Sequence, residues 1–164
     1  MGEKTSEVAK LRSLAQLDAD AIGAYDAAIS RVNEPMVRER LNDFRVDHVR
    51  HLQDLNAFIQ RFGGEPVELR PDLKGTAMKG LTAVTSMMGT EAALVAMLGN
   101  EEFTNRAYEM ALAFDWSPEV SGLIKKNRED EYRHVTWIRD AVRTRPWLRE
   151  GAGASAAEGS EIQA

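Results

Sequence analysis

Three histidines and a few acids with helical spacing are the side chains best suited to chemistry in this sequence. Glu131 and His134 form a Glu-x-x-His motif, and His48 and His51 repeat it with histidine in the glutamate position. Residues three apart lie on one face of a helix, so each motif can direct two ligand atoms to one point. A mixture of carboxylate oxygen and imidazole nitrogen suits iron, manganese or zinc. The spacing therefore indicates a metal site.

Both motifs belong to an internal repeat, in which the second half of the chain follows the first at a shift of 83 residues, the separation of His51 and His134. No gap is needed. The shift aligns residues of like role: Asp18 with Glu101, His48 with Glu131, His51 with His134, Tyr25 with Tyr108, and Pro35 with Pro118. A repeated unit of this size buries its apolar stripe only against its neighbour. We therefore expect two similar halves that pack together.

Four segments, at about 11–32, 37–62, 94–111 and 120–141, carry apolar residues in alternating steps of three and four. This stepping is typical of the inward stripe of a bundle helix. Six ionisable residues stand on these stripes where leucine is expected: Asp18, His48, His51, Glu101, Glu131 and His134. With a rise of roughly 1.5 Å per residue, all six lie at a similar height above the turns. They are predicted to share one layer at mid-bundle.

Prolines and glycines mark the limits of the helices. Asn33–Pro35 separates the first two segments, Ser117 and Pro118 separate the last two with Ser117 as N-cap, and Gly63–Gly64 ends the second. Some 27 residues then lead to the third helix, beginning with the glycine- and proline-rich stretch Gly63–Gly75 and followed by a run that can form a short apolar helix. We predict an all-α four-helix bundle of two antiparallel hairpins joined by a long crossover.

Composition limits the setting of this fold. The 164 residues make one domain at 1–148, followed by a small, polar tail at 149–164 that is expected to be mobile. A net charge of -5 with scattered arginines argues against nucleic acid as a partner. The absence of cysteine excludes disulfides and iron–sulfur ligation. No signal-like or membrane-spanning run is seen, so we expect a cytoplasmic location.

Six buried ionisable groups need compensation, because an isolated buried charge costs several kcal/mol. Two divalent cations would supply it, and a metal-free network of acids and histidines is the alternative. Four carboxylates near the layer but off the stripes are interpreted as solvated or as outer partners of the ligands: Asp20, Asp47, Glu102 and Asp130. Tyr25 and Tyr108 are expected to pack in the core with satisfied hydroxyls.

The two halves resemble the ferritin and rubrerythrin superfamily. Its signature is a carboxylate followed seven residues later by tyrosine, and then Glu-x-x-His on the next helix, all given twice. The matching positions are Asp18 and Tyr25, His48 and His51, Glu101 and Tyr108, and Glu131 and His134. The likeness covers about Leu11–Arg145, and the runs LDADAIGAYDAAI and DHVRHLQDLNAFIQRFGGEP are similar to a bacterial group of ferritin-like proteins classed as a domain of unknown function.

The resemblance implies a di-metal site at the six positions, with Asp18, His48 and His51 on one side and Glu101, Glu131 and His134 on the other. Two positions depart from the family. Asp18 is one methylene shorter than the usual glutamate, and His48 replaces the first bridging glutamate, so that only Glu131 is left to bridge. The second departure leaves open a mononuclear, mixed or weakly held site.

The leading hypothesis for function is a homo-oligomeric protein that binds two divalent ions, iron first, with an oxidase or peroxide-scavenging role in metal or oxidative stress. The alternative is a structural or interaction bundle whose metal site has decayed. A third and weaker hypothesis is membrane-surface binding through Thr76–Met97.

Overall fold

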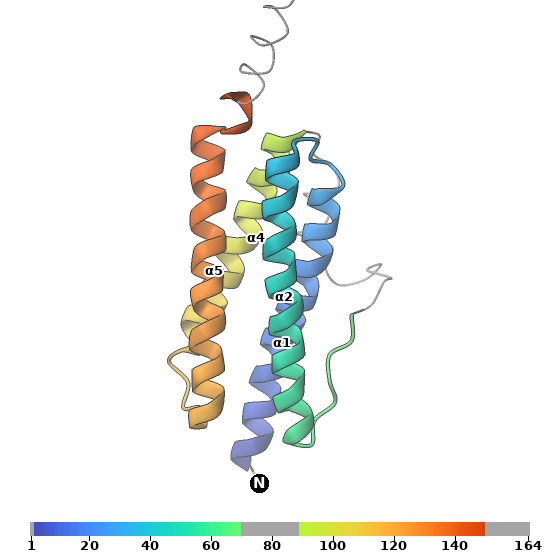
Figure 1. The fold of residues 1–164 in the computed structure, drawn as a ribbon. Helices are drawn as coiled ribbons and strands as arrows, with labels where there is room; N and C mark the ends of the chain where they lie inside the picture. The colour runs from blue at the N-terminus through green and yellow to red at the C-terminus, as the bar shows by residue number, and fades with distance from the viewer. Residues whose placement is uncertain (1, 70–88, 150–164) are drawn as a thin grey trace, which may run out of the picture.

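The structure is a computed structural model that describes residues 2–69 and 89–149. The described residues form four long helices, which lie side by side (Figure 1): α1 (Gly2–Ile29), α2 (Pro35–Arg61), α4 (Thr90–Ala111) and α5 (Pro118–Thr144). The described residues contain no strand, which confirms the predicted all-α class. None of the described helices is long and apolar enough to cross a membrane.

The helix limits follow the sequence signals. Pro35 and Pro118 occupy the first turns of α2 and α5, where the missing amide proton is not needed. Gly63, just beyond α2, has a φ of 81°, in the left-handed region that glycine enters at no steric cost. Ser117 stands at the N-cap position of α5 but makes no capping bond. Its hydroxyl donates instead to Glu7 Oε1 at 3.0 Å, so the capping prediction holds for its position only.

Two contacts between turns and distant helix starts fix the direction of the helices. The Thr90 hydroxyl at the start of α4 donates to Glu34 in the α1–α2 turn. Ser117 in the α4–α5 turn contacts Glu7 near the start of α1. Helix α4 therefore begins at the end of the bundle opposite the end of α2 (Figure 1). This placement of the two helix ends confirms the predicted long crossover. The expected short helix within it and the tail at 150–164 fall outside the described residues.

The core has two apolar parts. One is built around Leu11, Leu55 and Ile124, and the other around Leu41 and Leu94. The predicted stripes are buried along most of their length, but near the end of α2 the buried residue is Ile59. The neighbouring phenylalanines of that stripe, at 58 and 62, are only half-buried. A strict repeat of 3.5 residues drifts by roughly 20° per heptad around a straight helix, which accounts for this change of face.

Candidate metal centre

The six predicted ligands meet at the centre of the bundle, where every one of them is fully buried. Helix α1 supplies Asp18, α2 supplies two histidines, α4 supplies Glu101, and α5 supplies Glu131 and His134. Their ligand atoms form two groups, in each of which all atoms lie within 4.8 Å of one another. The Asp18 cluster comprises Asp18, His48, His51 and Glu131, and the Glu101 cluster comprises His48, Glu101, Glu131 and His134.

Each cluster takes three residues from one hairpin and one from the other. Glu131 of the second hairpin completes the Asp18 cluster, and His48 of the first hairpin completes the Glu101 cluster. The same exchange appears in the tyrosines. The Tyr25 hydroxyl donates to Glu101 Oε1, and the Tyr108 hydroxyl donates to Asp18 Oδ2, both at 2.6 Å. The hairpins are thus tied together through the centre, and the expected core role of both tyrosines with satisfied hydroxyls is confirmed.

Two carboxylates hold the outer nitrogens of the histidines. His51 Nε2 lies 3.1 Å from Asp130 Oδ2, and His134 Nε2 lies 3.0 Å from Asp47 Oδ2. These contacts turn Nδ1 of both rings toward the centre: His51 Nδ1 lies 3.2 Å from Asp18 Oδ1. Carboxylates in this position fix the tautomer and orientation of metal-ligating histidines. Asp47 and Asp130 thus make the contacts that the outer-partner reading expects, rather than being solvated.

An arginine from each of α2 and α5 braces these carboxylates. Arg50 contacts Asp130 and, at 2.9 Å, Asp47. Arg133 contacts Asp47 at 2.5 Å and Asp130 at 2.9 Å. Neither arginine was predicted to take part, although the repeat keeps both arginines and both aspartates unchanged. Asn127 was not predicted either: it lies on the stripe and donates to the Tyr108 hydroxyl at 3.3 Å.

Asp20 and Glu102, the other two acids off the stripes, play no part in the centre. Asp20 accepts from Gln16 at 2.9 Å, and Glu102 pairs with Arg139 on the exposed surface at 3.0 Å. For Glu102 the solvated reading is correct, whereas Asp20 is half-buried and burial raises its pKa.

Electrostatics of the metal-free centre favour charged histidines. Burial alone would lower the pKa of His51, but hydrogen bonds to Asp130 and Asp18 outweigh it and raise the pKa to about 10. Burial is outweighed in the same way at His48, chiefly by Glu131 and Asp18, and at His134, chiefly by Asp47; both pKa values are raised. Without a metal, imidazolium ions therefore balance part of the negative charge.

Glu131 differs from the other acids of the centre. Burial raises its pKa, and the nearby charges of Glu101 and Asp18 raise it further, against the lowering effect of His48. Burial also opposes ionisation of Asp18, yet the hydrogen bonds from His48 and His51 outweigh it and lower the Asp18 pKa. Glu131 is therefore the acid whose charge the metal-free protein compensates least well.

Among the described residues, His51 Nδ1 lies 3.2 Å from Glu131 Oε1 and His134 Nδ1 lies 3.5 Å from Glu101 Oε2, yet several buried atoms of the two clusters make no hydrogen bond of good geometry. They are both carboxylate oxygens of Glu131, Oε2 of Glu101 and Nδ1 of His134. Buried polar atoms without a partner are rare and cost about 1–3 kcal/mol each. Cations would satisfy all of them, because each cluster offers two nitrogens and two oxygens, a donor set that suits iron, manganese or zinc. The residues present fit two divalent ions.

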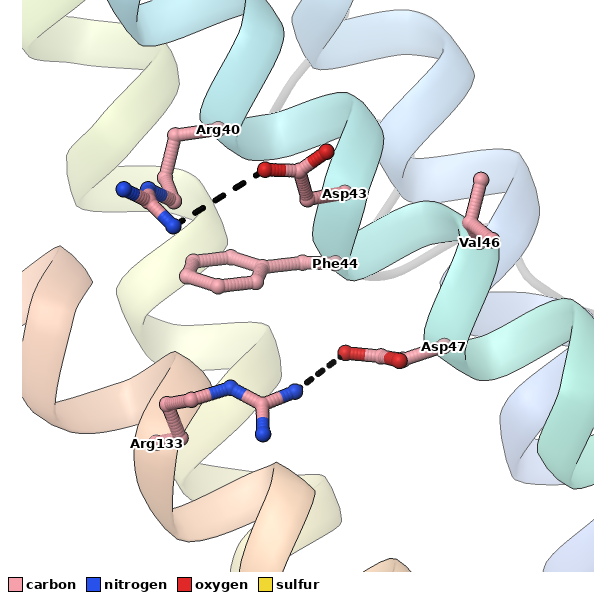
Figure 2. A pocket seen from close by; sticks show the side chains of 6 residues that line it. All are labelled: Arg40, Asp43, Phe44, Val46, Asp47 and Arg133. Atoms are coloured by element: carbon pink, nitrogen blue, oxygen red, sulfur yellow. Dashed lines mark hydrogen bonds and ion pairs between the residues drawn. The ribbon is translucent and has the colours of Figure 1, made fainter.

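A pocket of about 400 Å³ lies on the surface next to the centre (Figure 2). Residues of α2 and α5 line it: Arg40, Asp43, Phe44, Val46, Asp47 and Arg133. Figure 2 shows the Phe44 ring between the side chains of Arg40 and Arg133. The same ring packs on His134, with centroids 4.4 Å apart, and Asp47 holds Nε2 of that histidine. Two residues that line the pocket, Phe44 and Asp47, therefore contact His134 of the centre directly.

Comparison with known proteins gives a family and no activity. No curated protein matches the chain. A family model described as "Domain of unknown function (DUF2383)" matches residues 6–113, about two thirds of the chain. The match takes in α1, α2 and α4, and ends before α5, the helix that carries Glu131 and His134. By this match, the chain belongs to the DUF2383 family of domains of unknown function.

Proposed function

We propose that this protein is a ferritin- and rubrerythrin-like metal protein that binds two divalent ions, iron first, in the two clusters. In this proposal it acts as an oxidase or peroxide scavenger under metal or oxidative stress. One observation carries the metal part of the proposal: fully buried oxygens of Glu131 and Glu101 and a nitrogen of His134 lie in the two clusters without a hydrogen bond of good geometry. Their nearest contacts are only ion-pair contacts, with His51 Nδ1 3.2 Å from Glu131 Oε1 and His134 Nδ1 3.5 Å from Glu101 Oε2. A bundle that needed only stability would gain by placing apolar residues there.

The residues divide the work of such a centre. The six ligand residues would hold the ions, while Asp47 and Asp130 keep the histidine rings turned inward through Nε2. Tyr25 donates to Glu101 and Tyr108 donates to Asp18. Both tyrosines keep their protons, because burial and these facing carboxylates raise both tyrosine pKa values. When bound, a redox-active ion supplies electron exchange with dioxygen or a peroxide. The pocket beside Phe44 is the approach that we propose for small molecules, because Phe44 and Asp47 line it and both contact His134.

Anaerobic titration of metal-free protein with ferrous iron tests this function. We expect about two equivalents to bind, and oxidation on addition of peroxide to be faster than for iron in buffer. Glu101→Gln should weaken binding strongly, because it removes a ligand charge from a fully buried site. Glu102→Gln is the matched control, since the adjacent Glu102 pairs with Arg139 on the surface and should leave binding unchanged. Wild-type protein that binds no iron ends the proposal.

A metal-free structural bundle is the second candidate, and the contacts between histidines and acids favour it. His48 Nδ1 lies 2.8 Å from Asp18 Oδ1, and the raised histidine pKa values allow opposite charges to satisfy each other in part. This candidate predicts that apolar replacement of all six residues leaves thermal stability unchanged or raised, and that iron, manganese and zinc have no effect on melting. Metal-dependent stabilisation of the wild-type protein would exclude it.

We also propose that the protein is a cytoplasmic homo-oligomer. Phe103 and Met110 on α4 are 64% and 63% exposed, and their separation of seven residues places them on the same face of the helix. Large exposed apolar side chains on one face are typical of contacts between subunits. Light scattering on wild type and on Phe103→Ser with Met110→Ser tests the assembly: a wild-type monomer, or an oligomer that the double variant retains, contradicts this face as the interface.

A further inference from the structure

His48 occupies a special place between the two clusters. It aligns with Glu131 in the internal repeat, and these two are the residues that both clusters share. The ring of His48 lies between the other two imidazoles, with centroids 5.6 Å from His51 and 5.2 Å from His134. It is fully buried. A bridging carboxylate offers one oxygen to each of two ions, so the residue at this position must also serve both sides.

The two ring nitrogens of His48 point to different clusters. Nδ1 lies 2.8 Å from Oδ1 of Asp18, and Nε2 lies 3.2 Å from Oε1 of Glu101. The outer histidines differ, because each turns one nitrogen to the centre and the other to a carboxylate outside it. Among the described residues, both nitrogens of His48 contact carboxylates of the centre, and neither contacts a carboxylate outside it. Both of its lone-pair directions are therefore committed to the centre.

We propose that His48 bridges the two ions through its imidazole ring, with Nδ1 on the ion of the Asp18 cluster and Nε2 on the ion of the Glu101 cluster. This inference rests on the proposed metal binding and adds how the two ions are joined. Each ion takes the lone pair of one nitrogen, and the protons that the ring carried there leave to the buffer. Glu131 offers one oxygen to each ion and completes two clusters of equal composition.

An imidazole bridge sets the distance between the ions. With metal–nitrogen bonds of about 2.0–2.1 Å on both sides of the ring, the ions lie about 6 Å apart. Sites bridged only by carboxylate or solvent oxygen hold their ions about 3.5–4 Å apart. The distances between the ions in the two arrangements therefore differ by about 2 Å. Anomalous scattering from a crystal can resolve a difference of this size.

The experiment uses the full chain loaded with zinc for position and with copper(II) for electronic coupling. Wild type should bind two zinc ions about 6 Å apart with the His48 ring between them. Two copper(II) ions on one imidazole couple magnetically. During a titration with copper(II), the electron paramagnetic resonance signal per bound copper should therefore fall as the second equivalent per protein binds. Two zinc ions about 3.5–4 Å apart, or a single ion, overturn the bridge and leave metal binding intact. Protein that binds no ion overturns the proposed function itself.

Two variants separate bridging from simple ligation. His48→Glu restores the residue type of the repeat partner, so two ions should still bind but about 2 Å closer together than in wild type. An unchanged separation overturns the bridge. His51→Gln removes a ring from the Asp18 cluster alone, so one copper should bind, with its full signal and no coupling. Coupling that persists in His51→Gln overturns the assignment of one ion to each cluster. If His48→Glu fails to fold, the wild-type measurement decides alone.

Discussion

The charge of Glu131 should destabilise the metal-free protein and stabilise the loaded one. Neither of its buried carboxylate oxygens makes a hydrogen bond of good geometry, and the contacts of Oε1 with His51 and His48, at 3.2 and 3.5 Å, do not prevent burial and neighbouring acids from raising its pKa. Because a raised pKa means that folding disfavours the ionised form, the neutral isostere Glu131→Gln should relieve this penalty at pH 7. An unsatisfied buried polar group costs about 1–3 kcal/mol, and 1 kcal/mol moves the melting temperature of a domain of this size by about 2–4 °C. The amide remains a buried polar group and gives up the ion-pair contacts with His51 and His48, so it regains only part of this cost. In chelator, Glu131→Gln should therefore melt above wild type, by less than about 12 °C.

Metal should reverse the order. An ion present at 100 times its dissociation constant adds about 2.7 kcal/mol to the folded state. Wild type should gain this from both clusters in excess zinc, whereas Glu131→Gln loses a ligand common to both and should gain little. Differential scanning calorimetry in chelator and in zinc measures both effects, and Glu102→Gln, which changes an exposed glutamate, should follow wild type in both buffers. A Glu131→Gln protein that melts below wild type in chelator, or gains as much from zinc, refutes the reasoning.

Three further predictions concern the metal-free protein. Tyr25→Phe removes a hydrogen bond to the ionised Glu101 and should lower the free energy of unfolding by about 1.5–3 kcal/mol. Urea unfolding measures this loss, and an unchanged free energy would show that the Tyr25 hydroxyl does not make this bond. Hydrogen bonds outweigh burial and raise the pKa of His51 to about 10, so its contribution to stability is complete below pH 6.5 and should decline as the pH rises toward 10. Urea unfolding across this pH range measures the decline, and a free energy of unfolding that rises with pH would contradict it. Ile59→Ala should cost about 2–5 kcal/mol, more than Phe58→Ala, because only Ile59 is fully buried; equal losses would argue against the observed change of face.

Much of the fold was predictable because its signals are local. Proline at the first turns of α2 and α5 and glycine after α2 determine where helices begin and end, whatever lies around them. The change of face at Ile59 was harder to predict, since small deviations from a 3.5-residue repeat add up along a helix of 27 residues. The partner of the Ser117 hydroxyl could not be predicted, because Glu7 reaches it only through the tertiary fold.

The candidate site was predictable to the level of residues and faces. Spacing placed His48, His51 and His134 on inward stripes, and the structure brings them together. Spacing does not determine how a ring turns about its own bonds, so the two-sided contacts of His48 emerged only with the neighbouring helices in place. The exchange of partners between Tyr25 and Tyr108 likewise depends on the register of α1 against α4, which the sequence does not state.

Each cluster contains one residue from the opposite hairpin, and this arrangement has a consequence for damaged or truncated chains. A product that stops after α2 retains Asp18, His48 and His51 but lacks Glu131. Neither half keeps a smaller version of the centre, so occupancy depends on both halves being present and docked. Bound metal would therefore indicate that both hairpins are present and packed against each other.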